Sequence, residues 1–74
     1  MSRTLHISNI PEGTTGEEIV ALLQSESFNF HKDDPGMGYA KFASKEEAVK
    51  AVIECHNKVF KGRKIKVSFS KQSV

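Results

Sequence analysis

The sequence contains a single cysteine, Cys55, so a disulfide within one chain cannot form. Neither this cysteine nor the three histidines are spaced as metal ligands, and we expect no zinc site and no cofactor. No apolar run approaches the roughly 20 residues needed to cross a bilayer, and the N-terminus lacks the apolar core of a signal peptide. We therefore expect an intracellular protein in which Cys55 is a buried residue of a helix.

The length of 74 residues allows one domain, near the lower limit for a self-sufficient core, with a folded part at about residues 3–70. The 38% apolar and 27% charged fractions are typical of a folded chain. The net charge is only +2, but no acidic residue follows Glu54. Several basic residues do follow it: Lys58, Lys61, Arg63, Lys64, Lys66 and Lys71. This basic segment is either a footprint for phosphates or a charged edge strand that prevents sheets from associating.

Alternation of polar and apolar residues predicts four strands. They are expected at residues 4–8, 28–32, 38–42 and 64–69. Turn residues favour connections between them at 33–36 and 60–63.

Two helices are predicted by capping boxes that each precede an apolar stripe. Thr14 with Glu17 opens the first helix, and its stripe comprises Ile19, Val20, Leu22 and Leu23. Ser44 with Glu47 opens the second, and its stripe comprises Ala48, Val49, Val52 and Ile53. The resulting order predicts an α+β, ferredoxin-like βαββαβ sandwich, in which two helices cover one face of a four-stranded antiparallel sheet.

Strand parity separates the side chains of this sheet into a buried and an open face. The inward set should pack on the helix stripes: Leu5, Ile7, Phe28, Phe30, Ala40, Phe42, Ile65, Val67 and Phe69. The outward set lines the open face: Thr4, His6, Ser8, Asn29, His31, Met37, Tyr39, Lys41, Lys64, Lys66 and Ser68. Nucleobases stack on flat side chains, and lysines neutralise phosphates. The outward set therefore favours a surface for nucleic acid.

Two segments on the predicted strands resemble the motifs of RNA recognition motif domains. Residues 5–10 (LHISNI) resemble the ribonucleoprotein hexamer of the first strand, and residues 35–42 (PGMGYAKF) resemble the octamer of the third. The resemblance covers essentially the whole chain and implies binding of single-stranded RNA on the open face. It assigns the stacking positions of the family to His6, Met37 and Tyr39, of which only Tyr39 is an aromatic of the usual kind.

Residues 4–11, 46–57 and 66–71 are similar to the C-terminal recognition motif of polypyrimidine-tract-binding protein. This resemblance implies a preference for short pyrimidine-rich RNA, a role in RNA processing such as splicing, and a nuclear location. The expected RNA-binding residues are His6, Asn29, His31, Met37, Tyr39, Lys41, Lys64, Lys66, Ser68, Ser70 and Lys71. We expect a monomer as an isolated domain, with no membrane contact. Further recognition motifs of a parent chain, or other proteins, are candidate partners.

Two other functions on the same plan stay open at this point. A protein-interaction module with little RNA binding is one, although the outer faces of the helices carry few apolar residues. An acylphosphatase-like enzyme needs an arginine in the first loop, and a copper carrier needs a Cys-x-x-Cys motif. Residues 9–13 (NIPEG) contain no arginine, and the chain has one cysteine. Because no nucleophile turn is recognisable either, we expect no enzymatic activity.

Overall fold

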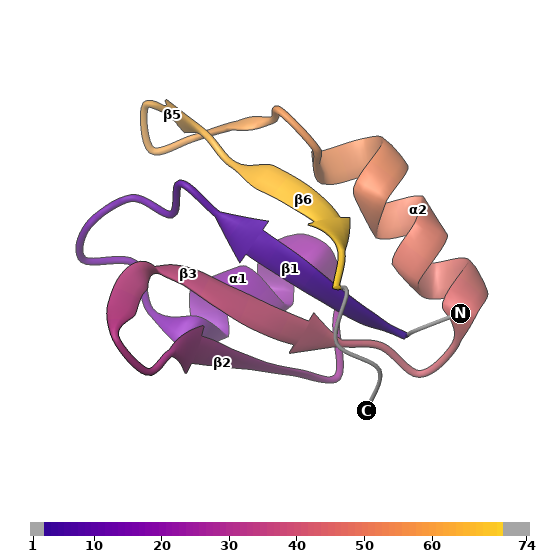
Figure 1. The fold of residues 1–74 in the computed structure, drawn as a ribbon. Coiled ribbons are helices and arrows are strands. Elements are labelled where there is room, and N and C mark those ends of the chain that lie inside the picture. Colours follow the sequence, from indigo (N-terminus) through magenta and orange to yellow (C-terminus); the bar gives the residue numbers. More distant parts are fainter. Residues whose placement is uncertain (1–2, 71–74) are drawn as a thin grey trace.

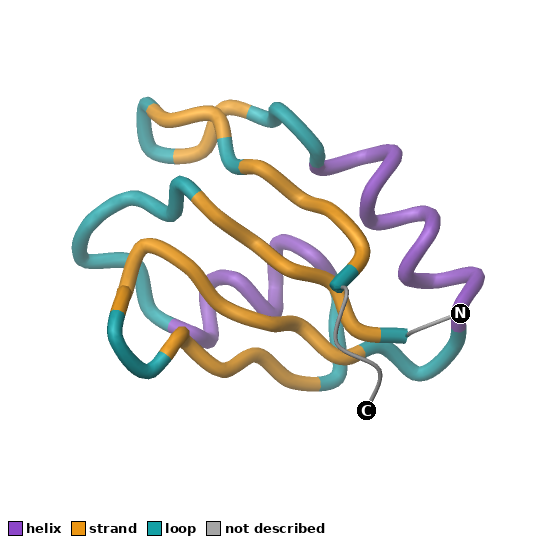
Figure 2. The backbone as a smooth tube through the Cα atoms, viewed as in Figure 1, coloured by secondary structure: helices purple, strands orange, loops and turns teal. Residues whose placement is uncertain are grey.

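The computed structural model describes residues 3–70, in which two helices cover one face of a sheet (Figure 1). The elements are β1 Thr4–Ser8, α1 Gly16–Leu23, β2 Ser27–His31, β3 Asp34–Lys41, α2 Lys45–Cys55, β4 Val59–Phe60, β5 Arg63–Lys64 and β6 Lys66–Phe69. The sheet has the antiparallel order β2-β3-β1-β6. The short strands β4 and β5 pair with each other and lead into β6 (Figure 2). The predicted ferredoxin-like fold is confirmed.

Helix α1 begins one residue later than the sequence suggested. Thr15 Oγ1 accepts a hydrogen bond from the Glu18 N–H at 3.2 Å, and Glu18 Oε1 accepts one from the Thr15 N–H at 3.0 Å. These two bonds form a complete capping box. The predicted capping box of Thr14 and Glu17 was wrong. Two threonines and two glutamates are adjacent here, so the sequence offers two equivalent boxes one residue apart.

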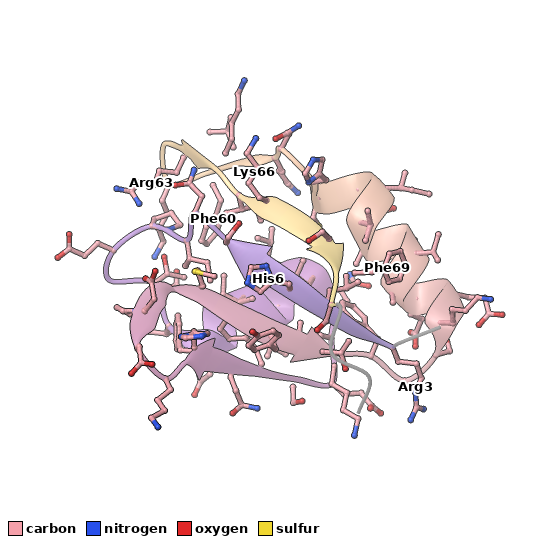
Figure 3. All side chains as sticks on the ribbon, viewed as in Figure 1. Arg3, His6, Phe60, Arg63, Lys66 and Phe69 are labelled. Carbon is pink, nitrogen blue, oxygen red and sulfur yellow. The ribbon has the colours of Figure 1, made fainter. Side chains whose placement is uncertain are left out.

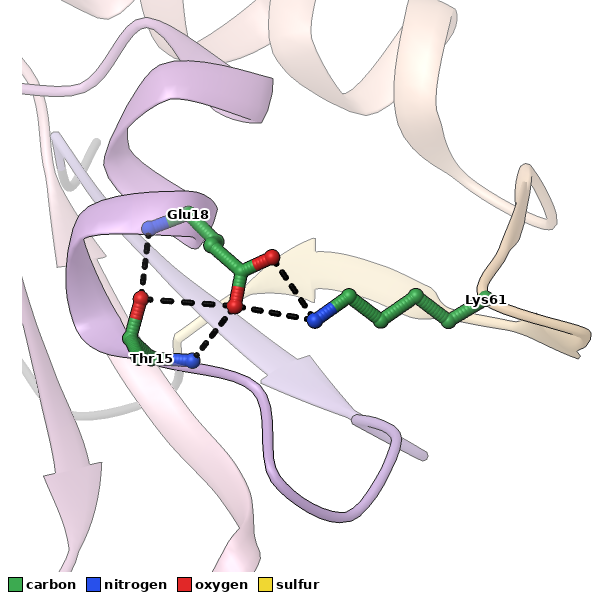
Figure 4. A network of polar contacts seen from close by, with 3 residues as sticks. All are labelled: Thr15, Glu18 and Lys61. Carbon is green, nitrogen blue, oxygen red and sulfur yellow. Dashed lines mark hydrogen bonds and ion pairs between the residues drawn. The ribbon is translucent and has the colours of Figure 1, made fainter.

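Lys61 ties the β4–β5 hairpin to this cap (Figure 4). Its Nζ lies 2.7 Å from Glu18 Oε2 and also donates to Glu18 Oε1 at 2.9 Å. The hydrogen bond from Lys61, followed by that from the Thr15 N–H, holds the pKa of the Glu18 carboxyl below its ordinary value. One carboxylate therefore takes part both in the cap of α1 and in a contact with the hairpin, which Asn9 also holds through a hydrogen bond from its Nδ2 to the Lys64 carbonyl at 2.8 Å.

Helix α2 packs through smaller residues than the predicted stripe. Ser44 caps it, because Ser44 Oγ accepts a hydrogen bond from the Glu47 N–H at 3.2 Å. The second bond of a capping box, from the Ser44 N–H to the Glu47 carboxylate, is not formed within residues 3–70, so the predicted box is only half present. Its buried residues are Ala48, Ala51 and Cys55. Ile53, predicted to lie in the buried stripe, is 77% exposed. Small side chains let the helix backbone approach the sheet, which apolar periodicity alone does not reveal.

Cys55 is buried on α2, as expected. Its Sγ lies 3.9 Å from the Leu22 carbonyl oxygen, to which the thiol donates. Burial raises the pKa of the Cys55 thiol. The side chain thus joins the two helices as a packing residue.

Strand parity correctly predicts the centre of the core but not its edges. Six predicted residues are at most 1% exposed: Leu5, Ile7, Ala40, Phe42, Ile65 and Val67. The prediction of burial was wrong for Phe30 and Phe69, each 37% exposed. Both lie on edge strands, β2 and β6, where helix coverage ends. Phe28 is half-buried and packs edge-on against Phe30, with ring centroids 5.0 Å apart.

The predicted fourth strand is divided at Ile65. The Ile65 N–H donates to the Lys58 carbonyl at 3.0 Å, and its carbonyl accepts from the Asn57 N–H at 2.8 Å. These bonds take Ile65 out of the ladder. Lys64 consequently pairs with Val59 in the hairpin and not with β1, so its predicted place in the main sheet was wrong.

Strand β3 begins earlier than predicted. Asp34 already pairs with His31 of β2, so the connection is a tight turn at residues 32–33, not at 33–36. The Asp34 carboxylate accepts a hydrogen bond from the Gly36 N–H at 2.9 Å, which accommodates Pro35 within the strand.

Candidate nucleic-acid interface

Three ring-bearing side chains lie next to one another across the open face. His6 of β1 is paired with Tyr39 of β3, with ring centroids 5.3 Å apart and planes tilted by 58°. His31 of β2 lies on the other side of Tyr39, with centroids 6.3 Å apart. All three are half-buried, so part of each ring stays accessible; His6 projects from the middle of the sheet (Figure 3). We call these three residues the ring platform.

The ring platform differs from the stacking set that the sequence predicted. Met37 was expected on the open face with Tyr39 and His6, and its stacking role there stays a prediction; the structure adds the His31 ring, whose centroid lies 6.3 Å from that of Tyr39. Met37 lies two residues along β3 on the same face and is half-buried. A register shift between Phe30 and His31 accompanies the turn at this end of β2. Sequence parity placed His31 outward but could not predict how closely its ring approaches Tyr39.

Polar side chains flank the ring platform on both outer strands. Asn29 lies opposite Tyr39 on β2, and Ser68 lies opposite His6 on β6. Both are exposed, so their amide and hydroxyl groups can bond to base edges. Ser70 is half-buried, and its N–H donates to the Thr4 carbonyl at 3.1 Å. Lys71 lies outside the described residues.

Two of the predicted lysines remain on the open face. Lys41 is exposed at the end of β3, opposite Thr4. Lys66 is exposed on β6 (Figure 3), where its Nζ donates to Asn57 Oδ1. Lys64 lies in the β4–β5 hairpin, beyond the main sheet. No carboxylate projects from the open face on β1, on β6 or on β3 from Met37 onward. The charge of this face therefore favours binding of RNA phosphates.

Gly38 allows β3 to lie close to β2 next to Tyr39, because it has no side chain. This role was not predicted from the sequence. A Cβ at this position would lie 2.6 Å from the Asn29 carbonyl oxygen and would also meet the Phe28 ring. No larger residue fits there without moving β2 or β3. A glycine inside a strand pattern is the signal for such a close approach.

Residues 5–66 match the family described as RNA recognition motif. The chain belongs to this family. It is 35% identical to Xenopus laevis nucleolin over 74 aligned residues, which cover 93% of this chain and 11% of nucleolin. The chain thus spans about a tenth of that curated relative.

Solved structures share the fold of this RNA recognition motif domain. RNA recognition domains 1 and 2 of Sex-lethal from Drosophila melanogaster match with a TM-score of 0.85 and 18% identity, over 95% of this chain and 50% of that one. The Rna15 motif with bound RNA (GU) matches with a TM-score of 0.81 and 22% identity, over 100% of this chain and 88% of that one. These identities support the common fold alone.

Residues 3–70 contain no group of three or more histidine, cysteine or carboxylate side chains that could hold a metal ion. None of their helices is long and apolar enough to span a membrane. The ring platform and its polar rim form the candidate site of the domain.

Proposed function

We propose that this domain binds short single-stranded RNA on the open face of its sheet. The observation that carries the proposal is the ring platform, in which His6, Tyr39 and His31 lie side by side on three neighbouring strands. Each stacked base contributes roughly 1–3 kcal/mol, as judged by alanine substitution. Lys41 and Lys66 supply the cations that bind phosphates and make the affinity depend on salt.

The proposed RNA is pyrimidine-rich. Two of the three rings are imidazoles, which offer less stacking area than the usual aromatics and so favour small bases. The similarity of residues 4–11 and 66–71 to the C-terminal motif of polypyrimidine-tract-binding protein supports the same preference. Ser68, Ser70 and Lys71 are the proposed contacts to base edges on the β6 side.

The wider role that we propose is in RNA processing, as a non-enzymatic domain of a nuclear protein. A platform of three rings accommodates only a few nucleotides, so modest affinity is expected from this domain alone. Other recognition motifs in a parent chain would increase the overall affinity by tethering.

Fluorescence anisotropy with labelled oligonucleotides tests the proposal. Wild-type protein should bind a short pyrimidine RNA more tightly than a purine RNA of equal length. Tyr39→Ala and His6→Ala should each weaken binding by roughly 5- to 150-fold, the range that corresponds to one lost stack. Lys45→Gln on α2 is the control, because it removes a cation from the helix side. Unchanged affinity in both platform variants would contradict the proposal.

A protein-interaction module is the second candidate, favoured by one observation. Ile53, Val59 and Phe69 are 77%, 61% and 37% exposed, and Phe69 lies on the strand that packs beside α2 (Figure 3). A partner protein whose binding is unaffected by Tyr39→Ala and lost in Ile53→Asp would support this function.

A further inference from the structure

A cleft opens at the end of the sheet where three connections meet. It is bordered by the β1–α1 connection with Pro11 and Thr14, the start of β3 with Pro35, and the β4–β5 hairpin with Arg63. It encloses about 310 Å³, a volume at the small end of ligand pockets. Figure 3 shows Arg63 at this end of the molecule and Arg3 at the opposite end. No residue of the ring platform lines the cleft, which we call the loop-end cleft.

The lining of the loop-end cleft combines an accessible aromatic ring with polar groups that lack partners. Phe30 is 37% exposed. Thr14 is only 8% exposed, yet its Oγ1 has no hydrogen-bond partner among residues 3–70. A buried hydroxyl without a partner costs free energy. The Arg63 guanidinium is exposed and forms no ion pair within the described residues.

Glu12 narrows the class of ligand that fits. Its carboxylate borders the same cleft as Arg63, so a free phosphate inside the cleft would meet a like charge. A planar base avoids this conflict, because its face can stack on Phe30 while an exocyclic amino group donates to Glu12. Cytosine N4 is such a donor, and carboxylates are its usual partners. The Arg63 guanidinium can then bind the phosphate of the same nucleotide.

The loop-end cleft lies at the end of β3, and its Phe30 ring is on the helix side of the sheet, close to Gly16 of α1. Gly36, which borders the cleft, is three residues from Tyr39, a span of about 10 Å in a strand. Met37 lies between them on the open face and is half-buried. The Ile10 N–H donates to the Gly36 carbonyl at 2.9 Å, so the pairing of β1 with β3 extends to the rim of the cleft. An RNA strand that crosses the ring platform toward this end would have to pass round the end of the sheet, beside Gly36 and Pro35, to enter the cleft.

We propose that the loop-end cleft binds one additional base of the RNA, a base with an exocyclic amino group, and that Arg63 holds its phosphate. This inference rests on the proposed function of the ring platform. It predicts that RNA longer than the platform gains affinity from the cleft, and that cytosine at the added position is preferred over uracil.

The test compares a four-nucleotide pyrimidine RNA with the same RNA extended at either end by three cytosines or by three uracils. Wild-type protein should bind one extended RNA roughly 5- to 150-fold more tightly, the gain expected from one more stacked base. Arg63→Gln, which removes the contact to the phosphate of this base, should reduce this gain and leave the affinity for the short RNA unchanged. Glu12→Gln should remove the preference for cytosine over uracil. Arg3→Gln, at the opposite end of the sheet, is the matched control and should retain the gain.

Three outcomes would overturn the inference. The gain could be undiminished in Arg63→Gln, or it could be lost only in Arg3→Gln, which would direct the strand to the other end. A proline-rich peptide, but no RNA, could shift the amide signals of Gly13, Thr14 and Gly36, which would assign the cleft to a protein partner. In each case tight binding of the short RNA, weakened by Tyr39→Ala, would leave the function of the ring platform intact. Failure of every RNA to bind would instead contradict the proposed function itself.

Discussion

Gly38 is a position where intrinsic propensity and packing predict opposite effects of the same substitution. Glycine in a strand costs roughly 0.5–1 kcal/mol relative to alanine, so Gly38→Ala should stabilise the protein if the site were open. In the structure the added Cβ would lie 2.6 Å from the Asn29 carbonyl oxygen and 2.8 Å from Phe28 Cε1. Overpacking of this kind costs about 1–3 kcal/mol. We therefore expect Gly38→Ala to lower the free energy of unfolding by about that amount.

Urea denaturation and thermal melts measure this effect. For a domain of this size the expected loss corresponds to a fall in Tm of roughly 4–24 °C. Gly16→Ala is the control, because its nearest neighbour would be a Phe28 ring atom at 3.7 Å, and alanine is the better helix former. Because Gly38 precedes Tyr39, the variant should also bind RNA less tightly. A Gly38→Ala protein as stable as wild type would refute the packing argument.

The caps and the cations allow three further tests. Ser44→Ala removes the cap of α2 and should lower the free energy of unfolding by about 1 kcal/mol in urea. The pKa of Glu18 is lowered in the folded state, so the ionised Glu18 carboxylate stabilises the fold above the unfolded pKa, and this stabilisation is lost as the pH falls through the folded pKa. The urea unfolding curves of wild type and Glu18→Gln should therefore converge in acid. Lys41→Gln should reduce the slope of log affinity against log salt by about 0.7, and Lys45→Gln should leave it unchanged.

The central strands could be predicted because two constraints act on them, the alternation of side chains along each strand and the pairing of neighbouring strands. In β1, alternation alone identifies Leu5 and Ile7 as buried and places His6 on the open face, since a shift by one residue would exchange the two faces. The pairing of His6 with Tyr39 follows once β1 and β3 are neighbours. The core of the candidate site could thus be predicted from the sequence.

The remaining features depend on contacts that periodicity does not encode. Thr14 and Thr15 are equivalent in sequence, and only the path of the preceding loop buries one and makes the other a cap. Ile65 leaves the sheet because backbone groups after α2 bond to it. The loop-end cleft arises where three connections far apart in sequence meet, so no local motif predicts it.

Amide chemical-shift mapping with a short pyrimidine RNA tests the central claim most directly. The account predicts that the largest shifts occur at His6, His31, Tyr39 and Ser68, on the open face, and that α2 amides such as Ala51 change little. Tyr39→Ala should reduce all of these shifts at the same RNA concentration, whereas Lys45→Gln should not. Shifts confined to α2 and the outer edge of β6, with none at the ring platform, would contradict the account.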